Sequence, residues 1–136
     1  MISDRVFLWA IVSVVAGVAG AAGRAQAADE FPFGLEMTLD APPMPGSKRR
    51  PNIEIGEAGE ARIELFCKGG KGQFSVAGNT IVFVAGAMEE RSCAPAQVAA
   101  DDALLASLSE AATWTRRGDA VTFIGERPLR FRINTN

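Results

Sequence analysis

Short runs in which apolar and polar residues alternate are the feature that most restricts the fold of this chain. In FGLEMTLD, Phe33, Leu35, Met37 and Leu39 share one face, and polar residues occupy the other. Such alternation is typical of a β-strand with one buried face. Further strands are predicted in NIEI, ARIELFC, QFSVA and TIVFVA and at 113–116, 120–124 and 129–133. TIVFVA is apolar throughout, which favours a central strand or one covered on both faces.

One stretch has a helical period instead. The apolar residues of DDALLASLSEAAT recur at helical spacing, which predicts one amphipathic helix whose leucine face packs on the sheet. Asp101 and Asp102 suit the start of this helix, through capping and the helix dipole. Pro95 also suits a first helical position, which would place the start earlier. The residues of the apolar face are Leu104, Leu105, Leu108, Ala111 and Ala112.

The connections between these elements indicate how they are arranged. Gly78-Asn79 suits a two-residue hairpin turn, and short hairpins imply an antiparallel sheet. The proline-rich stretch 41–51, APPMPGSKRRP, is expected to be a stiff, irregular crossover, because proline cannot donate a ladder hydrogen bond. The predicted fold class is α+β: a curled antiparallel sheet, or partly open (cracked) barrel, of about eight strands with one helix packed on it.

The N-terminal residues 1–27 have the pattern of a signal peptide. Val6–Gly23 carries no charge, and Ala25-Gln26-Ala27 is the small-x-small pattern of a cleavage site. A retained membrane anchor is the alternative, although the 18 uncharged residues barely span a bilayer. We expect cleavage after Ala27 and a soluble protein exported to a bacterial periplasm, with no stable membrane span after cleavage.

Cleavage there leaves one domain, 28–136. Removing Asp4 from the 16 acids, and Arg5 and Arg24 from the 14 bases, leaves 15 acids, 12 bases and a net charge of −3. This charge does not indicate a nucleic-acid-binding protein.

The glycine-rich stretch Gly69–Gly72 follows Cys67 in CKGGKGQF. A phosphate-binding loop needs a lysine and a hydroxyl residue after its last glycine and then a helix. Here the lysine precedes Gly72, and the next element is a predicted strand. The stretch is therefore interpreted as a glycine-rich hairpin turn.

Catalytic groups are scarce. The chain has no histidine and no tyrosine, so nucleophiles activated by histidine are excluded. Glu89 and Glu90 are adjacent and would point to opposite faces of a strand, unlike a glycosidase pair. The prediction is a protein that is not an enzyme, with no catalytic residue, cofactor or metal site.

Two other groups of residues are candidates for a role. The basic residues Lys48, Arg49 and Arg50, with Lys68 and Lys71, could contact an anionic partner or could simply be a solvated loop. Cys67 and Cys93 are the only cysteines. In an exported domain a disulfide between them is favoured over two separate buried thiols.

From Ile63 onward the chain resembles the META domain family of HslJ-like envelope proteins. The resemblance lies in the order of Cys67 with Phe74, then ERSCAP with Cys93, then DDALLASL, GDAVTF and LRF. It implies a compact α+β domain without established catalytic residues, and a role in the cell envelope, in stress or in secretion.

The resulting functional hypothesis is a non-catalytic periplasmic domain that binds a protein partner or a small apolar ligand. A groove between sheet and helix is its candidate site, and a fully packed core is the alternative reading of the same residues. These residues are Phe74, Phe83, Leu105, Leu108 and Trp114. The alternative function is a small protease-inhibitor-like module that presents the stiff proline-rich loop 41–51 to a protease.

Overall fold

The computed structural model describes residues 30–47 and 49–135, so the expected signal peptide lies outside the described residues. The described chain forms eight strands and one helix, in the predicted order of five strands, helix and three strands. They are β1 (Glu36–Leu39), β2 (Asn52–Ile55), β3 (Glu60–Glu64), β4 (Gly69–Ala77), β5 (Thr80–Met88), α1 (Pro95–Glu110), β6 (Thr113–Arg117), β7 (Ala120–Ile124) and β8 (Leu129–Ile133).

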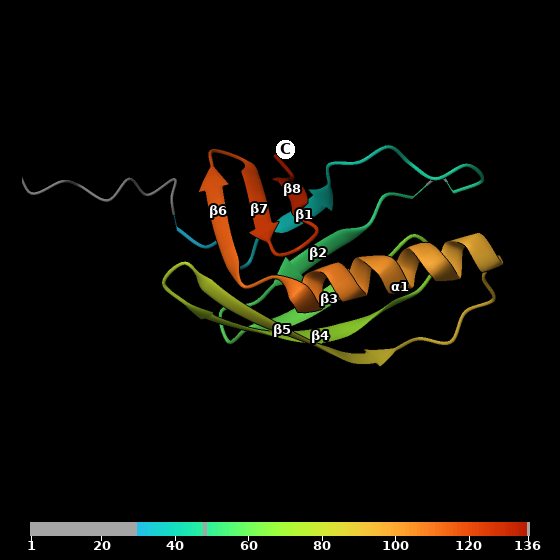
Figure 1. The fold of residues 1–136 in the computed structure, drawn as a ribbon, viewed down its shortest axis with the longest axis horizontal. Helices are drawn as coiled ribbons and strands as arrows, with labels where there is room; N and C mark the ends of the chain where they lie inside the picture. The colour runs from blue at the N-terminus through green and yellow to red at the C-terminus, as the bar shows by residue number, and fades with distance from the viewer. Residues whose placement is uncertain (1–29, 48, 136) are drawn as a thin grey trace, which may run out of the picture.

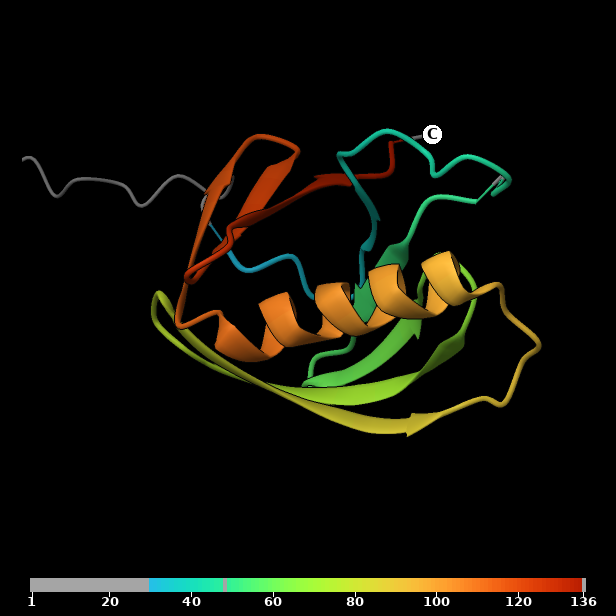
Figure 2. The ribbon, with the colours of Figure 1, turned by 45° about the vertical axis from the view of Figure 1, so that its right-hand side comes forward.

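The strands form an antiparallel barrel in chain order, closed by pairing of β1 with β8 (Figure 1). One seam of this barrel is weak, because β5 and β6 pair only at Thr80 and Thr113. The helix connects these two strands and packs against β5 (Figure 2). The predicted fold, a cracked α+β barrel with one helix packed on it, is confirmed.

The core fills the inside of the barrel. Phe74, Phe123 and Phe131 are its largest fully buried side chains, and the ring centroid of Phe123 lies 5.7 Å from that of Phe74 and 5.6 Å from that of Phe131. From the helix, Leu104 and Leu108 enter the same cluster. The leucine face of α1 therefore packs on the sheet as predicted.

The helix begins at Pro95, the earlier of the two expected starts. The side chain of Gln97 accepts a hydrogen bond from the backbone N–H of Ala94 at 3.0 Å, which satisfies one donor at the helix N-terminus. Asp101 and Asp102 therefore lie inside the helix, and their interpretation as residues of the helix start is wrong.

The glycine-rich stretch is part of a strand and not a hairpin turn, so that interpretation is also wrong. Gly69 to Gly72 form the start of β4, and the turn precedes them, where the Leu65 N–H donates to the Lys68 carbonyl at 2.7 Å. A Cβ atom on Gly70 would lie 2.5 Å from the Ala87 carbonyl oxygen, and one on Gly72 would lie 2.4 Å from the Phe83 ring. These glycines are required by close packing of neighbouring groups, a constraint that cannot be recognised from local sequence.

Of the two expectations for β5, the central position holds, because it lies between β4 and β6, whereas cover on both faces does not, because its outer face is open to solvent. Ile81 and Phe83 point into the core, whereas Val82 is 56% and Val84 61% exposed. The helix covers only the inner face of the β4–β5 hairpin (Figure 2). The long apolar run thus reflects one buried face and one exposed pair of valines.

Candidate functional site

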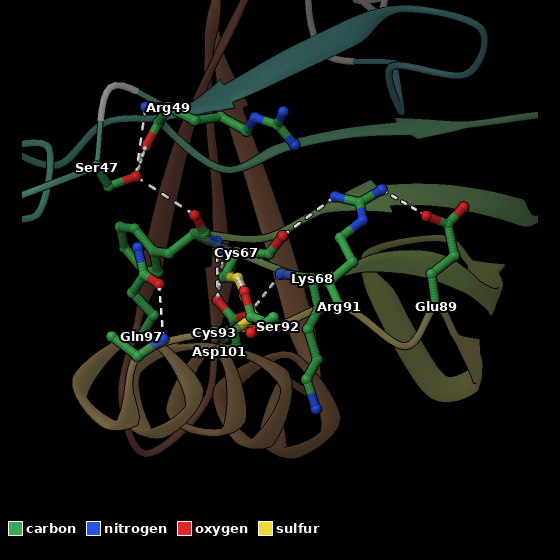
Figure 3. The surroundings of a disulfide bond; sticks show 12 residues. Ser47, Arg49, Cys67, Lys68, Glu89, Arg91, Ser92, Cys93, Gln97 and Asp101 are labelled. Carbon is green, nitrogen blue, oxygen red and sulfur yellow. Dashed lines mark hydrogen bonds and ion pairs between the residues drawn. A yellow bond between two sulfur atoms is a disulfide. The ribbon is translucent and has the colours of Figure 1, made fainter.

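The turn after β3 is held by a buried carboxylate from the helix. Asp101 is 1% exposed, and its two oxygens accept backbone N–H bonds from Phe66 (2.8 Å), Cys67 (3.3 Å) and Lys68 (2.8 Å) (Figure 3). Three N–H donors that converge on one carboxylate compensate for its burial. Asp101 therefore anchors this turn to α1.

Sequence reasoning missed this role. The available signal was the position of Asp101 at i−3 and i−7 from Leu104 and Leu108, which places a carboxylate on the apolar stripe of the helix. A carboxylate at such a position needs donors from another segment.

We expect Asp101→Asn to destabilise the domain by about 1–3 kcal/mol, because the amide group replaces one acceptor with donors that face N–H groups. Chemical denaturation measures this change, and Asp102→Asn on the exposed side of the same helix is the control. Equal stabilities of the two variants would contradict the anchoring role.

The predicted disulfide is present. Cys67 and Cys93 are bonded with a Cα–Cα distance of 6.0 Å, so the turn after β3 is also linked to the segment that leads into α1 (Figure 3). The strand predicted at ARIELFC would end at Cys67, but β3 ends at Glu64 and Cys67 lies half-buried in the turn. The disulfide therefore joins two connecting segments at the surface of the core.

Arg91 lies two residues before this disulfide and connects three groups. Its guanidinium donates to the carbonyl of Cys67 at 3.1 Å and to the carboxylate of Glu64 at 3.0 Å, and it pairs with Glu89. Arg49 donates to the same carboxylate of Glu64 at 2.8 Å. Two arginines thus converge on Glu64.

This arrangement shifts the acidity of Glu64. The hydrogen bond from Arg91 is the main cause that holds the pKa of Glu64 below its ordinary value of 4.5, against the opposing effect of burial. Glu64 therefore stabilises the fold above the unfolded-state pKa, and this contribution is lost as pH falls through the lower folded-state value.

A carboxylate NMR titration of Glu64 should give a midpoint below 4.5 in the native protein and a higher midpoint in Arg91→Gln. An unchanged midpoint in the variant would show that Arg91 does not carry the effect.

A cleft of about 590 Å³ lies on the outer face of the sheet, at the same end of the barrel. Its lining residues come from all five strands before the helix. Because these residues are far apart in the sequence, no sequence motif predicts the cleft. The lining residues are Glu36, Asn52, Glu54, Arg62, Ile63, Glu64, Gly70, Lys71, Ala87, Met88 and Glu89.

The strand register orders the charges of this cleft. Glu36 pairs with Glu54, Glu54 with Arg62, and Arg62 with Lys71 across β1 to β4. We name these four residues the charge row. It runs from two acids to two bases, with neighbouring strands about 4.8 Å apart. The glycines of β4 add no side chains here, so Met88 and Glu89 of the β5 end form the adjacent wall.

Of the five basic residues proposed from the sequence, the four that the structure describes are not gathered into one patch. Arg49 is paired with Glu64, Arg50 is exposed, and Lys71 lines the cleft. The side chains of Arg49 and Lys68 point in different directions (Figure 3), and Lys48 lies outside the described residues. Of these four described residues, only Lys71 lines the cleft.

The residues of the proposed apolar groove lie in or against the core. Phe74, Phe83, Leu108 and Trp114 are buried, and Leu105 is half-buried against them. The indole N–H of Trp114 donates to the Gly78 carbonyl at 2.8 Å. These side chains fill the space between sheet and helix, which favours the packed-core reading of the sequence.

Neither a metal-binding cluster nor a membrane-spanning helix is present among the described residues. No set of three or more carboxylate or cysteine side chains there could hold a metal ion. Nor is any helix in residues 30–47 and 49–135 long and apolar enough to cross a membrane.

A barrel of eight antiparallel strands with one helix at its seam, a cysteine after β3 and a second before the helix define a small α+β domain. The META domain family model matches residues 33–133. The chain therefore belongs to the META domain family, as the sequence motifs indicated.

A structure solved by NMR is similar to this chain, with a TM-score of 0.59 and 18% sequence identity. The match covers 74% of this chain and 89% of that chain. At this identity the likeness concerns the fold. The search of curated proteins gave no match.

Proposed function

We propose that this protein is a non-catalytic binding domain of the bacterial cell envelope, with a stress- or secretion-related role, and that its binding site is the outer-face cleft. The observation that carries the proposal is the charge row at the floor of the cleft, Glu36, Glu54, Arg62 and Lys71. The lack of histidine and tyrosine in the sequence and the META family membership support a binding role over catalysis.

The charge row favours a protein partner over a small apolar ligand. Arg62 and Glu54 pair with each other at 3.2 Å. A partner segment with a basic side chain opposite Glu36 and an acidic side chain opposite Lys71 would therefore complement the two ends of the row. Met88 adds an adaptable apolar contact at the wall. The proposed apolar groove offers less room, because its residues fill the core.

Affinity capture from periplasmic extract tests the proposal, with the mature protein as bait. Lys71→Glu reverses the charge at the basic end of the charge row. Arg117→Glu, at an exposed residue of β6, makes the same change of charge elsewhere and is the control. We expect proteins recovered with the native and control baits to be lost with Lys71→Glu. The same recovery with all three baits would refute the cleft as the binding site.

Export of the chain is a separate part of the proposal. The uncharged run Val6–Gly23 and the pattern Ala25-Gln26-Ala27 support cleavage after Ala27. A disulfide is also typical of oxidising compartments outside the cytosol.

The intact mass of the protein recovered from the periplasm should correspond to a chain that starts at Ala28. A mass that includes Met1 would contradict export by a cleaved signal peptide.

A second candidate function keeps one observation in its favour. In the loop 41–51, Pro42, Pro43 and Pro45 are exposed, while Ser47 donates to the Phe66 carbonyl at 3.3 Å. An exposed loop held by such a contact is the kind that a protease inhibitor presents. Inhibition of any member of a protease panel, with the loop left uncut, would favour this function over the envelope-binding one.

A further inference from the structure

Two independent links hold the turn after β3, but they do not hold the same second segment. The Asp101 carboxylate ties residues 66–68 to the body of α1 through three N–H bonds. The disulfide ties Cys67 to Cys93, which belongs to the connection between β5 and α1. Breaking the disulfide would leave the turn anchored by Asp101, whereas the connection would lose a covalent link.

The connection carries Arg91, which joins a wall of the cleft to its floor. Glu89 and Met88 form the wall, Glu64 belongs to the floor, and Arg91 contacts both Glu89 and Glu64. Figure 3 shows the contact of Arg91 with Glu89. Arg91 also donates to the carbonyl of Cys67 itself. Its contacts therefore span the two segments that the disulfide joins.

The disulfide should lower the entropy that Arg91 loses when it forms these contacts with Glu64, Glu89 and Cys67. Ion pairs of partly exposed side chains contribute little on their own, because ordering long side chains costs conformational entropy. Arg91 has a side-chain exposure of 30%, Glu64 of 37% and Glu89 of 63%. A covalent link two residues from Arg91 restricts its backbone, so less freedom remains to be lost when the guanidinium binds.

We propose that the Cys67–Cys93 disulfide is a redox-sensitive latch that controls the wall of the outer-face cleft. Reduction by a dithiol, either a small molecule or a thioredoxin-like protein, breaks the S–S bond. The dithiol supplies two electrons and two protons, becomes a disulfide itself, and leaves two cysteine thiols. The Glu89–Ala94 segment then opens locally, while the core and the Asp101 anchor keep the fold.

The opening should stay local because the segment that opens contributes no side chain to the core. The core cluster and the side chains packed against it include Met88 of β5, but none of these residues comes from the segment Glu89–Ala94. Glu89 keeps one strand-like bond, from its N–H to the Gly69 carbonyl at 2.7 Å. Segments with few buried contacts open at low free energy without global unfolding.

Amide hydrogen exchange of the mature protein, oxidised and reduced with dithiothreitol, tests the latch. We expect the amide of Glu89, which is bonded to the Gly69 carbonyl, to exchange at least about tenfold faster after reduction. The amides of Phe66 and Lys68, bonded to Asp101, should keep their protection. Unchanged exchange in the reduced, folded protein would overturn the proposal, and so would global unfolding on reduction.

A variant with the disulfide intact separates the latch from general loss of stability. Arg91→Gln should speed exchange of the Glu89 amide in the oxidised protein, whereas Arg127→Gln, which removes the pair with Glu110, should not. Equal exchange in Arg91→Gln and the native protein would also overturn the proposal.

Only the functional consequence of the latch, control of binding, rests on the proposed function. Exchange is measured without any partner, so failure to capture a partner and failure of the latch are distinguishable results.

Discussion

Replacing Leu108 with alanine should destabilise the domain by about 2–5 kcal/mol, the range for truncating a buried leucine. Leu108 is 1% exposed and lies where α1 meets the barrel core. Only one residue pair joins β5 and β6. Packing of the helix against the core therefore contributes much of the stability at this seam. Chemical denaturation of the native protein and the variant measures the loss.

Ser109→Ala, on the exposed side of the same turn, is the matched control and should change stability by less than about 0.5 kcal/mol. If Leu108→Ala were equally mild, the helix could not be docked on the sheet as the structure describes.

Removing the disulfide should cost about 3–4 kcal/mol, from the chain entropy that the closed loop removes from the unfolded state. The cysteines are 26 positions apart, so the loop has 26 + 1 = 27 residues with both ends counted. Cys67→Ser, Cys93→Ser and the double variant should lose similar amounts of stability, because the two cysteines act as one unit. Thermal and chemical denaturation measure the loss.

Thiol titration of the denatured, unreduced protein provides the direct check on the bond. Fewer than about one free thiol per ten chains is expected if the pair is oxidised in the exporting host. Two free thiols per chain would refute the bond and remove the basis of the latch.

Much of the fold was predictable because it depends on local periodicity. Met37 and Leu39 of β1, or Leu104 and Leu108 of α1, reveal their buried faces by spacing alone. The turn at Gly78 was also predictable, since its φ of 58° is a backbone conformation that glycine adopts without strain.

The remaining features depend on which segments meet in space. An aspartate such as Asp101 is a residue type that often starts a helix. Its role as an anchor is visible only once the turn at residues 66–68 is placed beside it. The charge row arises from the register of four strands, so Glu36 and Lys71 belong together although 35 positions separate their numbers. Gly70 looks like a turn residue until Met88 is placed against it. The disulfide partners were predictable because there were only two cysteines.

The pairing of β1 with β8 sets the order in which the molecule can be assembled. Leu39 faces Phe131, and Thr38 donates to Asn134 at 2.8 Å, so the first and last strands of the described chain complete the ring together. A chain that ends before Leu129 would leave β1 and β7 each without a neighbour on one side. Bare strand edges recruit other chains. Nonsense products and C-terminally clipped forms should therefore be cleared by proteases or aggregate, instead of accumulating as stable fragments.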